Sequence, residues 1–238
     1  IVIDNGTVTT IAGPPAGTTT PGDTDNATAS NARFYSPYGI TTDGTNLYVS
    51  DTGNNKIRKI VIDNGTVTTL AGPPAGTTTP GDTDNVTASN ARFQSPAGIV
   101  FVDGNLYVAD WYNNKIRKIN IDNGTVTTFA GPSAGITASG DTDNATASNA
   151  RFYRPFGMTT DGINLFVSDV GNNKIRKIVI DNGTVTTIAG PPAGTTASGD
   201  TDNDTASNAR FSNPYGISSD GTYIYVGDFS NNKVRRIE

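Results

Sequence analysis

The residues best suited to chemistry in this sequence are carboxylates that recur at a fixed spacing. Four aspartates, each directly after a short apolar run, lie 59 residues apart: Asp51, Asp110, Asp169 and Asp228. If the apolar runs surround a common axis, a ring of four carboxylates could bind a cation there. The alternative is that each aspartate caps backbone N–H groups of the turn that follows it. We favour the capping role, because it is the ordinary one for an aspartate at a strand end.

A second set of hard oxygen donors recurs in an Asp-x-Asp-Asn motif, at Asp23, Asp25 and Asn26 and again at Asp82, Asp84 and Asn85. Such oxygens suit Ca²⁺, but the motif lacks the acidic spacing and the closing glutamate of a known calcium loop. The sequence has no histidine and no cysteine, which excludes histidine-based acid–base pairs, imidazole metal sites and thiol chemistry. We therefore predict no enzymatic activity, no metal site and no cofactor.

Asn-x-Thr triplets, which accept N-linked glycans in secreted proteins, also recur in phase. One set lies in Asn-Gly turns and the other in the Asp-x-Asp-Asn motif, and the candidate sites are Asn5, Asn26, Asn64, Asn85, Asn123, Asn144, Asn182 and Asn203. A repeat duplicates any triplet that its ancestor carried, and Asn-Gly-Thr is also favourable turn chemistry. All of these asparagines are nevertheless expected on exposed loops or turns, so covalent glycans are one predicted class of partner.

Aromatic residues mark several positions at which the recurring segments differ. We take as the candidate binding rim Tyr38, Trp111, Tyr112, Phe156, Tyr215 and Phe229. Exposed aromatic rings can stack on sugars or anchor a protein partner. Drift at unconstrained loop positions would give the same pattern, and the differences between 41–45 and 100–104 fall elsewhere.

Basic residues recur as Lys-Ile-Arg-Lys at 56–59, 115–118 and 174–177. We expect them to form a solvated strand edge that discourages aggregation. The formal net charge of −5 and the sequence pI of about 4.7 argue against nucleic acid as a partner. No apolar run approaches the roughly 20 residues of a membrane span, and no leader segment opens the sequence, which fits a mature form, an excised piece or a cytosolic protein.

All of these motifs recur because the chain is a tandem repeat. The copies are 1–59, 60–118, 119–177 and 178–236, and Ile237 and Glu238 begin a fifth. The first two copies are identical at 47 of 59 positions. A fixed period of this length is typical of solenoids, propellers and arrays, whose repeats share a continuous core.

Turn residues divide each copy into four short strands. Between Ser36 and Gly72 these are expected at 39–42, 46–50, 56–62 and 66–70. The second strand is apolar almost throughout, as expected when both faces of a sheet are covered. A meander with two apolar faces must stack on its neighbours, and radial stacking gives a β-propeller. A β-solenoid fits less well, because its coils pair in parallel.

The segment SPYGITTDGTNLYVSDTGNNKIRKI (36–60) resembles an NHL-repeat blade through Pro-x-Gly-Ile, Leu-Tyr-Val-x-Asp and Asn-Asn-Lys-Ile-Arg. The copies at 95–119, 154–178 and 213–237 match as well, and 6–34 is similar to the connecting stretch of long bacterial NHL repeats. The resemblance implies an all-β propeller of four-stranded antiparallel blades over 1–238. It leaves function open, since propellers host many unrelated activities.

The two ends of the chain fall within the same strand of the repeat. Residues 1–4 match the second half of a third strand and 233–238 match its first half, so the last blade lacks a fourth strand. Because an open arc would expose two apolar blade faces, we expect 7–11 to supply that strand and to close a ring of four blades. A ring of eight blades shared by two chains and a longer or polymeric array are the alternatives.

Two classes of function follow from these patterns. We predict a non-enzymatic, extracellular or cell-surface structural scaffold, glycosylated and repeating along a fibre or surface layer, with other copies of itself or a longer repeat chain as partners. The near-identical copies and the Thr/Asn/Gly-rich loops favour this class. The alternative is a protein- or glycan-binding module that uses the aromatic rim.

Overall fold

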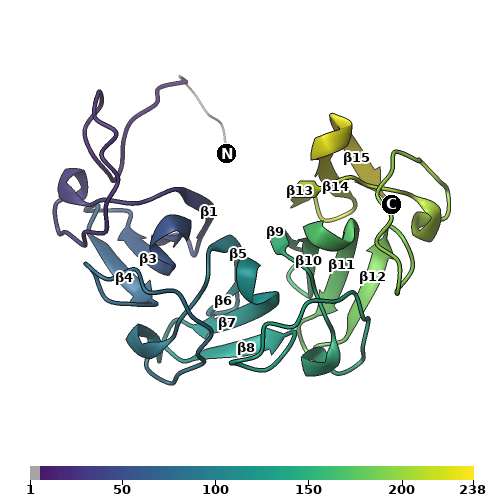
Figure 1. The fold of residues 1–238 in the computed structure, drawn as a ribbon. Coiled ribbons are helices and arrows are strands. Elements are labelled where there is room, and N and C mark those ends of the chain that lie inside the picture. The colour runs from purple at the N-terminus through teal and green to yellow at the C-terminus, as the bar shows by residue number, and fades with distance from the viewer. Residues whose placement is uncertain (1–5) are drawn as a thin grey trace.

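The computed structural model describes residues 6–238, which form short antiparallel strands joined by turns. The strands make four sheets, or blades, around a common axis (Figure 1). The first blade consists of β1 (Pro37–Thr42), β2 (Asn46–Asp51), β3 (Lys56–Val61) and β4 (Val67–Ala71). The second consists of β5 (Pro96–Val102), β6 (Asn105–Asp110), β7 (Lys115–Asn120) and β8 (Val126–Ala130). The third consists of β9 (Pro155–Thr160), β10 (Asn164–Asp169), β11 (Lys174–Val179) and β12 (Val185–Ala189). The fourth is β13 (Pro214–Ser219), β14 (Ile224–Asp228) and β15 (Lys233–Ile237). The predicted four-bladed, all-β propeller is confirmed.

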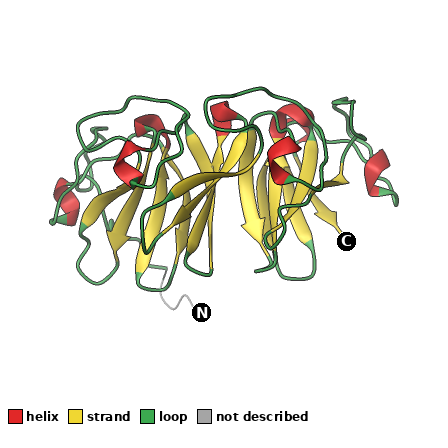
Figure 2. Cartoon of the chain, turned by 90° about the horizontal axis from the view of Figure 1, so that it is seen from below, coloured by secondary structure: helices red, strands yellow, loops and turns green. Residues whose placement is uncertain are grey.

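The connections differ between the two ends of the strands. Single turns of 3₁₀ helix join the second and third strands at one end of the blades, namely η2 (Thr52–Asn54), η4 (Trp111–Asn113), η6 (Val170–Asn172) and η8 (Phe229–Asn231). Hairpins with glycine at positive φ, such as Gly65 at 70°, close the other end. Further 3₁₀ turns lie in the long connectors, namely η1 (Ala29–Asn31), η3 (Ala88–Asn90), η5 (Ala147–Asn149) and η7 (Ala206–Asn208), and Figure 2 draws all of these turns in red around the strands. The connector turns pack beside the outermost strands, as Ala29 does against the Gly65 hairpin.

Apolar side chains fill the spaces between neighbouring blades. Between the first two blades Tyr48, Ile57 and Phe93 pack against Leu106 and Val108, and equivalent clusters lie between the second and third blades and between the third and fourth. The innermost strands approach more closely than side chains would allow. A Cβ atom on Gly39, Gly98 or Gly157 would collide with a backbone carbonyl of the next blade. Neighbouring blades are therefore closest together near the axis and farther apart at the outer rim.

Buried ion pairs fasten each connector to its blade. The Lys56 ammonium lies 2.6 Å from Asp23, and the Arg58 guanidinium lies 2.7 Å from Asp25 and 2.8 Å from Asp51. Both basic side chains are fully buried, so the prediction of a solvated basic edge is wrong for them. The alternate residues of β3 face the connector that folds back over them, and its aspartates neutralise their charge.

The blades form an open arc, and the predicted closure into a ring is not observed (Figure 1). Within residues 6–238 the last sheet contains the strands β13-β14-β15, and 7–11 form no strand. The connector that follows is held on the first blade, where the Asn26 N–H donates to Val67 O of β4 at 3.0 Å, and within the connector the Gly13 N–H donates to Ala29 O at 3.0 Å. Segment 7–11 therefore starts at the opposite end of the arc from β15. Residues 1–4, which the prediction also used, lie outside the described residues.

Candidate functional site

Six aromatic residues meet at the end of the propeller where η2, η4, η6 and η8 join the second and third strands, and we call them the aromatic face. The repeat places them there: Tyr38, Phe156 and Tyr215 each follow the proline that starts an innermost strand. Trp111 and Phe229 begin the 3₁₀ turns η4 and η8, and Tyr112 follows Trp111. The structure thus brings together all six residues of the candidate binding rim, from four different blades.

The rings of the aromatic face contact one another in series. Phe156 is buried at the centre, with ring centroids 4.4 Å from Tyr38, 4.8 Å from Tyr215 and 5.0 Å from Trp111, all edge to face. Tyr215 continues the series to Phe229 at 5.4 Å. Each such contact contributes about 0.5–1.5 kcal/mol beyond area burial. The series ties the first, second and fourth blades to the third at the axis.

Three of the six rings remain open to solvent. Phe229 is 68% exposed, Tyr38 57% and Tyr112 40%. Tyr112 stacks on Trp111 at 4.5 Å, and the Arg154 guanidinium lies 5.6 Å from the centre of the Tyr112 ring. Large exposed rings held on a rigid base are the usual anchors of a binding surface.

Two polar groups add hydrogen-bonding capacity to the aromatic face. Burial, and after it the neighbouring Tyr215, raises the pKa of Tyr38, so its hydroxyl keeps the proton that it can donate. The indole Nε1–H of Trp111 is buried without an acceptor among the described residues. A shallow pocket of about 310 Å³ lies beside Phe229 and Tyr215. Because the indole N–H is covered, the face offers a ligand its exposed rings and the Tyr38 hydroxyl.

The recurring aspartates after each second strand do not form a cation site. Asp51, Asp110 and Asp169 are fully buried. In Asp51 one carboxylate oxygen accepts the Tyr35 backbone N–H at 2.8 Å, and the other accepts Asn54 at 2.9 Å and Arg58 at 2.8 Å. Burial raises the pKa of these three carboxyls, while the hydrogen bonds and the arginine oppose the shift. Each of these carboxylates does accept a backbone N–H group, but the donor precedes the first strand of the blade. The predicted capping of backbone N–H groups in the following turn is therefore not observed.

The Asp-x-Asp-Asn motif likewise serves structure. Asp23 and Asp25 bind Lys56 and Arg58, and Asp25 also accepts the Thr69 N–H at 2.9 Å. Over the part of the chain that the structure describes, no group of three or more acidic residues could hold a metal. Sequence reasoning missed these ion pairs. The available signal was the constant separation of 33 residues between each aspartate and its cation in every copy.

The candidate glycan acceptors lie at the surface or partly under it. Asn64, Asn123, Asn182 and Asn203 are exposed, and Asn26, Asn85 and Asn144 are half-buried. In each, the side-chain oxygen accepts the backbone N–H of the threonine two residues on. Asn5 lies outside the described residues. Glycosylation of these sites remains a prediction.

Comparison with known proteins fits this architecture. The family model of the teneurin NHL domain matches residues 25–238. The chain belongs to this NHL-domain family. It is also 30% identical over 178 residues to NHL repeat-containing protein 2 of Homo sapiens, a match that covers 69% of this chain and 23% of that protein. The chain spans less than a third of the length of the curated relatives it matches.

Solved structures resemble this NHL domain in fold. An auxiliary nutrient binding protein from Bacteroides ovatus superposes with a TM-score of 0.66 at 17% identity, over 87% of this chain and 49% of that one. A virginiamycin B lyase from Staphylococcus aureus gives a TM-score of 0.51 at 21% identity, over 84% and 50%. At these identities the likeness concerns the fold alone. In the described residues, no helix has the length and apolar character needed to cross a membrane.

Proposed function

We propose that the protein is a non-catalytic binding scaffold that holds a ligand against the aromatic face. The observation that supports this most strongly is the series of ring contacts from Tyr38 through Phe156 to Phe229, with its outer rings exposed. The copies differ from blade to blade at the aromatic face, and the first two also differ at 41–45 and 100–104. A scaffold of uniform blades with one asymmetric surface suits recognition better than it suits a purely structural role.

The chemistry of the face favours a ligand with a flat or apolar surface and hydrogen-bond acceptors, such as a sugar ring. The exposed rings of Phe229 and Tyr112 can stack on it, and the Tyr38 hydroxyl supplies a donor. The extracellular or cell-surface location that the sequence predicts is part of this proposal. A fibre or surface layer remains a prediction from the repeat.

The proposal is tested by titrating the protein with an oligosaccharide panel and following the fluorescence of its single tryptophan, Trp111. Phe229→Ala should weaken any binding by about tenfold, or about 1.4 kcal/mol. Tyr223→Ala, near the hairpin at the opposite end of the strands, is the matched control and should bind as the parent does. Absence of binding across the panel, or equal loss in both variants, would contradict the proposal.

A further inference from the structure

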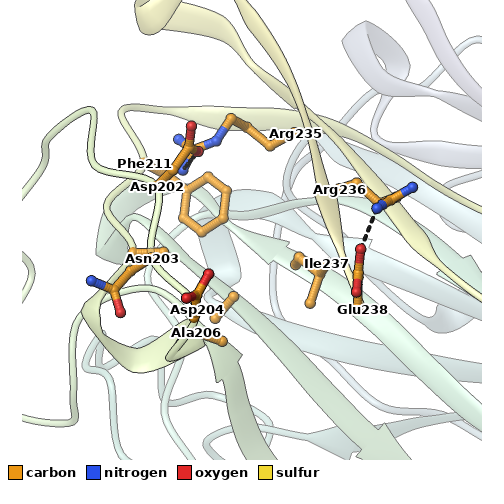
Figure 3. A pocket seen from close by; sticks show the side chains of 11 residues that line it. Asp202, Asn203, Asp204, Ala206, Phe211, Arg235, Arg236, Ile237 and Glu238 are labelled. Carbon is orange, nitrogen blue, oxygen red and sulfur yellow. Dashed lines mark hydrogen bonds and ion pairs between the residues drawn. The ribbon is translucent and has the colours of Figure 1, made fainter.

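Arg154 differs from the other arginines of the chain, because its guanidinium has no hydrogen-bond or ion-pair partner among residues 6–238. Every other arginine donates from its guanidinium to a carbonyl or carboxylate oxygen. Figure 3 shows one such pair, between Arg236 and Glu238, in a cavity of about 530 Å³ beside β15. The Arg154 side chain is exposed, on a protein whose formal net charge is −5. Its charge and its N–H donors are therefore available to an anion from solution.

The fold does not need an arginine at this position. The other copies carry Ser36, Ser95 and Asn213 there, with φ of 50°, 53° and 52° against 57° for Arg154. The Arg154 backbone N–H donates to the Asn114 side chain at 2.9 Å, and the N–H groups of Ser95 and Asn213 make the same bond at 2.8 and 3.0 Å. Small polar residues therefore meet the backbone requirement, and the long charged side chain of Arg154 is not explained by the fold.

Two tyrosine rings from neighbouring blades position the guanidinium. It lies 5.6 Å from the centre of the Tyr112 ring and 5.4 Å from that of Tyr153, within the range of cation–π attraction. Tyr112 is itself stacked on Trp111 at 4.5 Å. The Tyr153 ring packs over Gly171, where an added Cβ atom would lie 2.5 Å from it. Both rings are therefore held in place, and their contacts leave the N–H donors of the guanidinium unused.

Acidic side chains of the second and third blades do not neutralise Arg154. At this end of the blades Asp110 and Asp169 are fully buried and pair with Arg117 and Arg176 at 2.9 and 2.7 Å. The exposed aspartates of these blades lie in the hairpins at the opposite end of the strands, and they are Asp103, Asp122, Asp161 and Asp181. Charges separated by more than about 10 Å are largely screened at ordinary ionic strength. The edge of the aromatic face at Arg154 therefore carries a local positive charge on an acidic protein.

We propose that Arg154, Tyr112 and Tyr153 form a subsite for the carboxylate of an acidic sugar, a uronate. This inference rests on the proposed function and specifies its ligand. The planar guanidinium matches a carboxylate, which it can bind through two parallel N–H donors. Tyr112 and Tyr153 are 40% and 38% exposed, so the sugar ring that carries the carboxylate can stack on them. An acidic peptide would use the charge but would leave the exposed rings without a flat partner.

The first experiment compares acidic oligosaccharides with their own neutral forms. The probes are oligomers of galacturonate, mannuronate and glucuronate, and the same oligomers after reduction of every carboxyl group to an alcohol, each titrated against the fluorescence of Trp111. We expect at least one uronate to bind about tenfold to a hundredfold more tightly than its reduced form. If every reduced form binds as well as its uronate, the subsite is overturned while the scaffold proposal stands. If neither form binds in any pair, both are overturned.

Two further probes separate a uronate from other anions. Oligoglutamate carries carboxylates without a sugar ring, and a sulfated glucose oligomer carries rings without carboxylates. Both should bind more weakly than the best uronate. Equal or tighter binding of either probe would show that the site does not select the carboxylate of a sugar, and would overturn the proposal.

The second experiment tests Arg154 itself. Arg154→Ser installs the residue that two other copies carry in the same backbone conformation, so the melting temperature should not change. We expect it to weaken binding of the uronate alone, until both forms bind alike, whereas Phe229→Ala should weaken both forms together. Lys59→Ser is the matched control, because Lys59 also lacks an ion-pair partner in the described part of the chain but lies on β3 of the first blade. It should keep the preference for the uronate, and equal loss of preference in the Arg154 and Lys59 variants would overturn the proposal.

Discussion

At the scale of single residues, Lys115 and Lys233 occupy the same position in two copies but differ in their surroundings. The Lys115 ammonium is fully buried 2.6 Å from Asp82, and the Lys233 side chain is 44% exposed at the same distance from Asp200. Removing one partner of a buried pair leaves an uncompensated charge. Lys115→Met should therefore lower the free energy of unfolding by about 3–5 kcal/mol, as measured by denaturant titration.

Lys233→Met is the built-in control for that substitution. An exposed pair contributes about 0–1 kcal/mol, so the midpoint of unfolding should barely move. If the two variants lost equal stability, the buried pairs would not be what fastens the connectors to the blades.

Asp43 allows a test of pH dependence at the residue scale. Burial would raise the pKa of its carboxyl, but hydrogen bonds from Asn46, Tyr48 and Thr45 lower it below the usual value. An acid with a lowered folded-state pKa adds stability above its unfolded pKa of about 4, and that stability is lost as the pH falls through the folded value. Asp43→Asn should thus cost about 1 kcal/mol at neutral pH and progressively less below about pH 4.

Asp63→Asn, at an exposed hairpin aspartate, controls for the general effect of removing a negative charge. Its stability should follow that of the parent at every pH. A cost for Asp43→Asn that did not shrink in acid would show that the carboxylate charge is not what the hydrogen bonds stabilise.

At the scale of strands, the close approach of the innermost strands depends on glycine. A Cβ on Gly98 would meet backbone atoms of the third blade, which cannot move aside as a side chain can. Gly98→Ala should therefore lower the free energy of unfolding by about 1–3 kcal/mol. Gly216→Ala, the same position on the open face of the fourth blade, has no atom within 4 Å of the added carbon. It should leave the free energy of unfolding nearly unchanged, and chemical denaturation of both variants checks this.

Much of this strand-level structure could be predicted from the sequence. The Asp-Gly and Asn-Gly turns fixed the strand limits to within one or two residues, as at β2, expected over 46–50 and found over Asn46–Asp51. The burial of Lys56 and Arg58 could not be predicted from their local pattern, because it depends on a connector that folds back over β3 from 33 residues earlier. The gathering of the aromatic residues did follow from strand order, since second-to-third and blade-to-blade connections share one end.

At the scale of the whole molecule, an open arc should be unevenly stable. The second and third blades are covered on both faces, whereas the first and fourth each have one exposed face. In repeat architectures stability is close to a sum of unit and interface contributions. Hydrogen exchange should therefore be slowest in β6, β7, β10 and β11 and faster in β14 and β15. Uniform protection would mean that the arc unfolds as one cooperative unit.

The curvature of the arc could not be predicted from the sequence. The repeat fixes how many blades there are, but the angle between them depends on how the side chains of each wedge pack. Between the second and third blades, for example, Gly98 lies at the axis and Phe152 further out, and the angle depends on the packing at both places. The expectation that four blades close into a ring took the exposed apolar faces as a sufficient reason, but those faces do not determine the angle between blades.

The uniform period of the chain also means that fold and recognition can be separated by genetic deletion. Joining Lys59 directly to Ile119 removes one full copy yet preserves the phase of every strand and each kind of blade contact. The same deletion takes away Trp111 and Tyr112. A shortened protein of this kind should still fold while losing part of its ligand surface. Gain or loss of whole copies during evolution can therefore change ligand specificity while every intermediate sequence still folds.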